Sequence, residues 1–171
     1  MSTISGLVGF PNPVNEKAAR VVAGLVVLTA LTALLIQADW LLWLLALGFL
    51  LRVLSGPRFS PFGLLATRVV APRLGRPKLV PGPPKRFAQG LGLVFSLSAA
   101  ACVALGATVL GWSLVGLLVV AAVLESAFAF CLGCAIFGVL QRAGWVPESV
   151  CEACASVGTR ADTDAYPVAL P

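Results

Sequence analysis

Four long apolar runs restrict the fold of this sequence more than any other feature. We expect them to form membrane-spanning helices over about 18–36, 40–54, 87–110 and 112–140. A helix of about 20 apolar residues crosses the hydrocarbon core of a bilayer and satisfies its own backbone hydrogen bonds there. The chain is 59% hydrophobic and 11% charged, which excludes an ordinary soluble domain. We therefore predict an all-α fold, an integral membrane four-helix bundle embedded in the lipid bilayer.

The distribution of charge predicts how the bundle is oriented in the membrane. Eight of the twelve Lys and Arg residues lie at 52–86, between the second and third spans. The turns at 37–39 and 110–112 contain neither residue type. By the positive-inside rule, the basic segment and both termini face the cytoplasm of a multi-pass protein in the plasma (inner) membrane. Because the positive charges gather beside membrane spans, we interpret them as a topology signal and expect no nucleic-acid partner.

The basic segment also predicts a short interfacial helix between the second and third spans. Ser60 and Pro61 form a helix-start signal, and apolar residues recur with helical spacing until Pro72. We expect an amphipathic helix lying in the membrane interface, followed by an extended proline-rich stretch at 76–84. The candidate residues for binding anionic lipid headgroups are Arg58, Arg68, Arg73 and Arg76. Membrane orientation alone also explains these arginines.

The chain divides into three parts by composition. Residues 1–16 are predicted to be an irregular N-terminal segment, because prolines in it disfavour helix. Asn15 is placed to cap a helix that starts at Glu16. Residues 17–154 form the membrane domain with its C-terminal cysteine segment, and 155–171 lack apolar periodicity and are predicted to be a flexible tail.

Two Cys-x-x-Cys pairs are the strongest chemical signal. Cys131 and Cys134 lie near the end of the fourth span, and Cys151 and Cys154 lie in the polar segment after it. The sixteen residues between the pairs match the spacing of four-cysteine metal sites and of two dithiols that exchange with each other. The sequence contains no His, so thiols must carry whatever chemistry there is. We expect the four thiols to gather at the cytoplasmic edge of the membrane.

Three interpretations of the four cysteines stay open. In the first, they act in thiol-disulfide exchange or sulfur transfer, which requires no cofactor and indicates a membrane thiol oxidoreductase. In the second, they bind zinc or an iron-sulfur cluster in a non-enzymatic membrane scaffold or assembly subunit. In the third, they are inert residues that help helices pack. We favour the first, since a cysteine pair inside a membrane helix is unusual for a zinc site.

Glu125 is a second chemical signal, independent of the cysteines. Placing an ionisable side chain within a membrane span costs free energy, so such a residue is a candidate functional residue. Here the hypothesis is a proton relay or a small transporter. The alternative is a hydrogen bond that joins helices, with Gln89 or Ser96 as the partner. On a continuous helix Glu125 lies about 240° from Cys131, so we expect the two side chains to face different sides.

Four segments are distinctive enough to compare with a known family. They are FPNPVNEKAARV, GPRFSPFGLLATRVVAPRLG, KRFAQGLG and FCLGCAIFGVLQR. Together they resemble an uncharacterised family of small bacterial four-helix membrane proteins, catalogued as a domain of unknown function, with the Cys-Leu-Gly-Cys motif as the most specific part. The resemblance implies a four-helix membrane bundle and no settled activity. Members of that family look like neighbours of thioredoxin-like and sulfurtransferase proteins, which implies a cytoplasmic partner of that kind.

Overall fold

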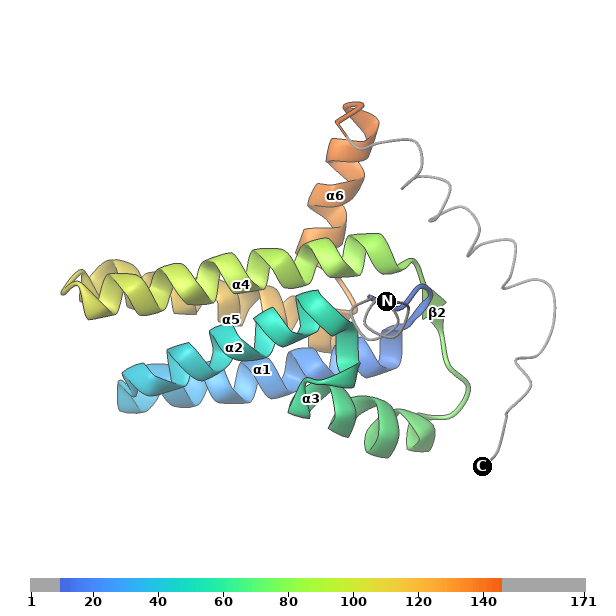
Figure 1. The fold of residues 1–171 in the computed structure, drawn as a ribbon, viewed down its shortest axis with the longest axis horizontal. Helices are drawn as coiled ribbons and strands as arrows, with labels where there is room; N and C mark the ends of the chain where they lie inside the picture. Colours follow the sequence, from blue (N-terminus) through green and yellow to red (C-terminus); the bar gives the residue numbers. More distant parts are fainter. Residues whose placement is uncertain (1–9, 146–171) are drawn as a thin grey trace, which may run out of the picture.

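The computed structural model describes residues 10–145, and over this range the chain is mostly helical, as predicted (Figure 1). Within the range, four α-helices are long and two are short. The long helices are α1 (Glu16–Ile36), α2 (Asp39–Ser55), α4 (Gly82–Ala104) and α5 (Thr108–Phe128). The short helices are α3 (Pro61–Leu64) and α6 (Leu132–Arg142).

Three of the described helices, α1, α4 and α5, are long and apolar enough to cross a membrane, which indicates a membrane protein. We expected a fourth span over 40–54. The corresponding helix α2 has 17 residues, and at a rise of about 1.5 Å per residue it is about 26 Å long, shorter than a hydrocarbon core of roughly 30 Å. Its first turn contains Asp39 and its last turn contains Arg52. By length alone, α2 is a marginal span.

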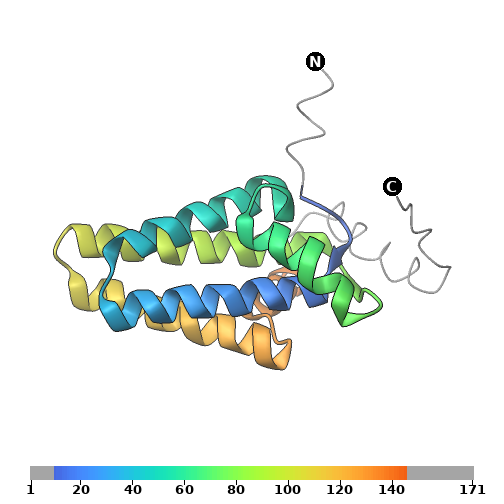
Figure 2. The same ribbon diagram turned by 90° about the horizontal axis from the view of Figure 1, so that it is seen from below.

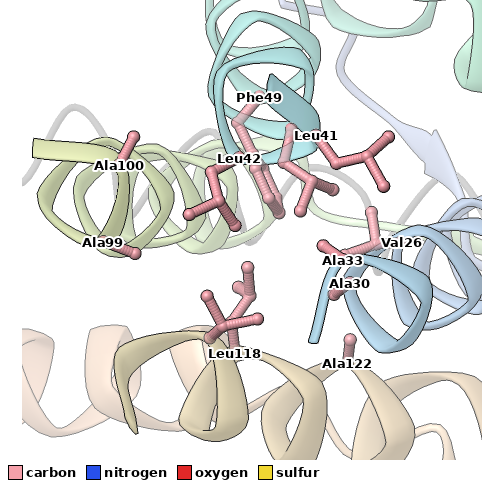
Figure 3. Close-up of a cluster of buried hydrophobic side chains, with 12 residues drawn as sticks. Val26, Ala30, Ala33, Leu41, Leu42, Phe49, Ala99, Ala100, Leu118 and Ala122 are labelled. Atoms are coloured by element: carbon pink, nitrogen blue, oxygen red, sulfur yellow. The ribbon is translucent and has the colours of Figure 1, made fainter. Parts of the chain in front are cut away.

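The four long helices lie side by side around a shared apolar core (Figures 2 and 3). Helix α1 packs against α2 and α5, and α4 packs against the same two helices. The core sets the large side chains of Leu42, Phe49 and Leu118 against small residues such as Ala30 and Ala99. Small residues let helices approach closely, which is the main source of helix packing in lipid.

Gly111 has a different role from the one that we expected. We predicted that it forms the turn between the third and fourth spans. The structure places the turn earlier, where Gly106 has a φ of +85°, and α5 already includes Gly111. A Cβ atom at position 111 would lie 2.5 Å from the side chain of Val103 on α4. The glycine therefore permits close packing of α5 on α4.

The basic segment gathers at the end of the long helices opposite to the α1–α2 and α4–α5 turns, and we call this the loop end (Figure 2). Its backbone is helical over most of 56–74, in short pieces. The Ser60 side chain accepts a hydrogen bond from the Gly63 N–H, as the start signal predicted. The pieces are η1 (Gly56–Arg58), α3, the π-helical η2 (Leu65–Val70) and the 3₁₀-helical η3 (Ala71–Leu74).

A two-stranded sheet ties the N-terminal segment to the basic segment. Strand β1 (Val14–Asn15) pairs antiparallel with β2 (Leu79–Val80). Asn15 accepts a hydrogen bond from the Lys17 N–H and caps α1, as predicted. The neighbouring Glu16 carboxylate lies 2.7 Å from Lys78 Nζ, so an ion pair reinforces the sheet.

Helix α4 begins earlier than the predicted third span at 87–110. It starts at Gly82, with prolines in the first turn, where the missing N–H groups cost nothing. We had assigned 76–84 to an extended stretch and Lys85 to the basic loop. The earlier start places Lys85 on α4, where its side chain is buried.

Candidate thiol site

A helix break positions the first cysteine pair. The sequence predicted one continuous helix over 112–140, but α5 ends at Phe128 and α6 begins at Leu132. Ala129 adopts a left-handed conformation with a φ of 58°. Figure 1 shows that α6 then runs crosswise to the long helices. The break therefore moves the cysteine pair from the interior of a helix to the start of a new one.

Arg20 on α1 stabilises the end of α5. Its Nε donates to the Ser126 carbonyl at 3.1 Å, and its Nη2 donates to the Ala127 carbonyl at 3.0 Å. The last carbonyls of a helix lack partners within the helix and carry the negative end of its dipole. A guanidinium there satisfies both the hydrogen bonds and the charge, so it favours ending the helix at this point.

Helix α6 is held against the start of α4. A Cβ atom at Gly133 would lie 2.5 Å from the Cβ of Ala88, so the two backbones meet where no side chain intervenes. One helical turn on, the rings of Phe137 and Phe87 lie 5.6 Å apart. Since Gly133 lies between the two cysteines, this contact holds the pair beside α4.

Cys131 immediately precedes α6, and Cys134 lies in its first turn. Both are free thiols and half-buried. The Cys134 side chain hydrogen-bonds to Cys131, and this bond, helped by the Lys85 ammonium, lowers the pKa of the Cys131 thiol although burial and Glu125 oppose the shift. The same hydrogen bond, together with burial, raises the pKa of Cys134. The two shifts have opposite directions, with the lower pKa at Cys131, and a lower pKa favours the thiolate that attacks a disulfide.

A buried ion pair lies beside the cysteines. Lys85 Nζ is 2.7 Å from Glu125 Oε1, and both side chains are largely buried. Glu125 therefore pairs with the Lys85 amine, whereas the helix-joining alternative named Gln89 or Ser96 as its partner. The expectation that Glu125 and Cys131 face different sides is also wrong, because both line one cavity. The helix break explains the difference, since the rotation of 100° per residue does not continue through residues 129–131.

Arg52 adds a second buried cation to this region. Its Nε donates to Gln89 Oε1 at 2.8 Å, and its Nη1 donates to Ser60 Oγ at 3.3 Å. Both partners are neutral. Buried charge is costly unless it is compensated, so the hydrogen bonds to Gln89 and Ser60 help to stabilise the Arg52 guanidinium.

Two cavities meet at Cys131. One has a volume of about 280 Å³, lies between the long helices and α6, and is mostly apolar. The other also has a volume of about 280 Å³ and lies at the loop end, where Glu16, Pro81 and Lys85 line it together with both cysteines. Cys131 therefore contributes to the walls of both cavities.

A comparison with family models covers the same region. The model described as "Domain of unknown function (DUF4395)" matches residues 14–142, three quarters of the chain. The chain belongs to the DUF4395 family. No curated protein and no solved structure matches it. The matched DUF4395 domain includes Lys85, Glu125, Cys131 and Cys134.

The second cysteine pair lies beyond the matched DUF4395 domain. Cys151 and Cys154 are also outside the residues that the structure describes, so the predicted meeting of the two pairs stays a prediction. Within residues 10–145, no group of three or more His, Cys, Asp or Glu side chains is arranged to hold a metal ion.

The remaining candidates lie away from the cysteines. Arg68, Arg73 and Arg76 are exposed, which a headgroup-binding role requires, and the side chain of Arg58 falls outside the described part of the structure. Cys102 lies near the far end of α4 and is a free, half-buried thiol.

Sequence reasoning missed Lys85 and Arg52 as parts of the site, and it named Gln89 only as a possible partner of Glu125. Lys85 and Arg52 were counted only as loop charges. The signal that was available is their position beside apolar runs that contain a single carboxylate, Glu125, since a buried carboxylate requires a cation.

Proposed function

We propose that this DUF4395 protein is a membrane thiol-disulfide exchange module in which Cys131 attacks and Cys134 resolves. The observation that carries the proposal is the placement of Cys131 at the start of α6, beside Lys85 and within hydrogen-bonding range of Cys134. A helix N-terminus and a nearby cation are the two features that make a cysteine thiolate available at neutral pH.

The reaction balances as follows. The Cys131 thiolate attacks one sulfur of a disulfide in a partner, forms a mixed disulfide and releases the other partner sulfur as a thiolate. Cys134 loses its proton, attacks Cys131 Sγ, and forms the Cys131–Cys134 disulfide while the second partner thiolate leaves. Two electrons and two protons pass from the protein to the partner. The same thiolate could accept the outer sulfur of a partner persulfide, in which case the partner leaves as a thiolate and Cys131 becomes the persulfide.

The membrane setting is part of the proposal. We infer a four-span bundle in the plasma (inner) membrane with α6 in the interface and both termini in the cytoplasm, supported by the basic loop end. Leu132, Ile136 and Val139 form an exposed apolar stripe on α6 that suits an interfacial position. A cytoplasmic thioredoxin-like or sulfurtransferase protein would reach Cys131 at the loop end. Cys151 and Cys154 would serve as a second dithiol in this exchange.

The ion pair gives Glu125 a positioning role in this account. Glu125 holds Lys85 beside the cysteines, and it is not required to carry a transported ion.

The scaffold alternative needs a metal on all four cysteines. Elemental analysis of the purified full chain separates the two, since a stoichiometric metal would occupy the thiolates that exchange requires.

Trapping of a mixed disulfide tests the proposed order of attack. The background is a full-length chain with Cys102→Ser, Cys151→Ser and Cys154→Ser, reduced and then treated with glutathione disulfide. Cys134→Ala should accumulate a glutathione adduct on Cys131, whereas Cys131→Ala should react more slowly, because Cys134 lies within α6 and the burial that raises the pKa of Cys134 remains. Mass spectrometry of peptides locates the adduct. An adduct that forms equally fast on either single cysteine would contradict the assigned roles.

A further inference from the structure

The apolar cavity beside Cys131 has the properties of a ligand site. Its volume of about 280 Å³ is close to the lower end of the range for small-molecule pockets, about 300 Å³. Apolar side chains from the long helices and α6 form most of its wall. The polar side chains in the wall are Gln89, Glu125 and Cys131, and they belong to three different elements of the fold. A few convergent polar groups in an apolar pocket are typical of a site that orients a ligand.

Exposed apolar side chains form part of the cavity wall. Leu117 and Val120 on α5 and Leu132 and Ile136 on α6 line the cavity and are also exposed, by 57%, 56%, 37% and 43%. In a membrane these exposed apolar side chains contact acyl chains. A ligand that enters between them must itself dissolve in the bilayer, which excludes charged metabolites and proteins.

Gln89 is the side chain of the wall that favours a ligand with a carbonyl oxygen. A guanidinium only donates hydrogen bonds, so Arg52 fixes the Gln89 amide with its oxygen toward Arg52. The amide nitrogen of Gln89 is then the atom that can donate to a ligand. Cys131 supplies the reducing electrons, and the Cys134 thiol supplies a proton. A ligand here must therefore accept electrons, protons and a hydrogen bond.

We propose that this cavity binds the ring of a membrane-soluble quinone, which oxidises the Cys131–Cys134 dithiol. The proposal rests on the proposed thiol function and names its membrane-side partner. In the reaction, the S–S bond forms and the dithiol loses two electrons and two protons. The quinone gains both electrons and both protons, one proton coming from Cys134 and one from solvent to replace the proton lost by Cys131. Both ring carbonyls become hydroxyls.

The second cavity completes a two-sided arrangement. It opens at the loop end and includes Cys131 and Cys134 among charged residues, Glu16 and Lys85. In the combined cycle an aqueous dithiol reduces the Cys131–Cys134 disulfide from the loop end, which is the reverse of the proposed exchange, and the quinone reoxidises the pair from the lipid side. The cysteine pair thereby connects an aqueous thiol pool to a membrane quinone pool.

The test uses duroquinone, a fully methylated benzoquinone that thiols reduce but cannot substitute on the ring. Reduced full-length protein with Cys102, Cys151 and Cys154 replaced by Ser is mixed anaerobically with duroquinone in detergent. We expect one quinol and loss of two free thiols per chain, and no quinol from Cys131→Ser. Ala121 lies in the cavity wall, so Ala121→Phe should slow quinol formation about tenfold or more. Ala127→Phe, on the exposed surface of the same helix, is the matched control and should leave the rate unchanged.

A second variant tests the cavity in case Ala121→Phe does not fold. Leu117→Trp narrows the exposed mouth without entering the core and should also slow quinol formation. Ala121→Phe, Leu117→Trp and Ala127→Phe are each assayed in parallel with glutathione disulfide, which approaches from the loop end and should react with all three at the wild-type rate. Wild-type exchange with glutathione disulfide but no quinol would overturn the quinone proposal and leave the thiol function standing. If Ala121→Phe and Leu117→Trp both form quinol at the wild-type rate, the cavity is not the quinone site. If the protein with only Cys131 and Cys134 reacts with neither duroquinone nor glutathione disulfide, both proposals are wrong.

Discussion

At the scale of single residues, the reactivity of Cys131 depends on the charges that surround it. The Lys85 ammonium lowers the pKa of Cys131, whereas the Glu125 carboxylate raises it. We predict that Lys85→Gln raises this pKa and slows alkylation of Cys131 by iodoacetamide at neutral pH, because less thiolate is present. Glu125→Gln should do the opposite. The measurement is the pH dependence of alkylation in a chain that retains only Cys131 and Cys134.

The matched control for the charge variants is Arg86→Gln. Arg86 is the next residue along the chain, is exposed, and donates to the Val53 carbonyl. It should leave the pH profile of Cys131 unchanged. A rise in the pKa with Arg86→Gln as large as that with Lys85→Gln would show a general effect of positive charge and contradict a specific role for Lys85.

Cys134 provides the largest single effect on Cys131, through the hydrogen bond between the two side chains. We predict that Cys134→Ala raises the pKa of Cys131, so the alkylation profile moves to higher pH. Cys134→Ser retains a hydroxyl donor and should move the profile less. If the Ala and Ser variants titrate alike, the hydrogen bond is not the cause of the low pKa.

At the scale of helices, the docking of α6 on α4 depends on the absence of a side chain at Gly133. Gly133→Ala should cost about 1–3 kcal/mol, typical of overpacking at a close contact, because the new Cβ meets Ala88. We expect lower amide protection of α6 in hydrogen exchange and a Cys131 thiol that reacts less readily. Gly138→Ala is the matched control on the same helix, since a Cβ there contacts nothing within 4 Å. It should be neutral or stabilising, by up to about 1 kcal/mol.

The end of α5 depends on a single side chain of α1. Arg20→Gln removes the two hydrogen bonds to the Ser126 and Ala127 carbonyls. We predict a loss of about 1–2 kcal/mol and faster hydrogen exchange at the end of α5, because charge-assisted hydrogen bonds contribute in this range. Arg68→Gln, at an exposed position, should have no measurable effect on either. Unchanged exchange in Arg20→Gln would contradict the capping role.

Helix boundaries show what the sequence could and could not predict. Asn15 and Ser60 cap helices as expected, because capping is a local interaction between neighbouring residues. The break between Phe128 and Leu132 was not predictable in the same way, since it contains neither Gly nor Pro. Its causes are long-range: Arg20, more than 100 residues earlier, and the contact of Gly133 with α4. The length of the predicted span at 112–140, well beyond the roughly 20 residues that a bilayer needs, was the available warning.

The same distinction holds for the site. The Cys131–Cys134 motif and Glu125 stand out in the sequence because their residue types are unusual in apolar segments. Their grouping with Lys85 depends on where α4 begins and on where α5 ends. Both boundaries depend on tertiary contacts. The sequence could therefore predict which residues belong to the site, but not how their side chains are arranged in space.

At the scale of the whole molecule, the basic segment and the cysteine pair lie at the same end, since Val80, Pro81, Cys131 and Cys134 line one cavity. If the positive-inside rule holds, Cys131 faces the cytoplasm. In a chain that retains only Cys131, an impermeant maleimide should label inside-out vesicles and not right-side-out vesicles. Thr108 lies at the opposite end of α5. In a chain whose single cysteine is introduced by Thr108→Cys, the maleimide should label right-side-out vesicles and not inside-out vesicles. Labelling of Cys131 from the outside would invert the topology.

The central claim is that Cys131 and Cys134 form a reversible redox pair, and equilibration in glutathione redox buffers tests it most directly. The chain for this measurement carries Cys102→Ser, Cys151→Ser and Cys154→Ser, is purified anaerobically, and is quenched with an alkylating agent at each buffer ratio. Mass spectrometry should show a Cys131–Cys134 disulfide that forms and disappears reversibly as the ratio changes, with loss of two hydrogens per chain. Two thiols that stay reduced at every ratio would contradict the account.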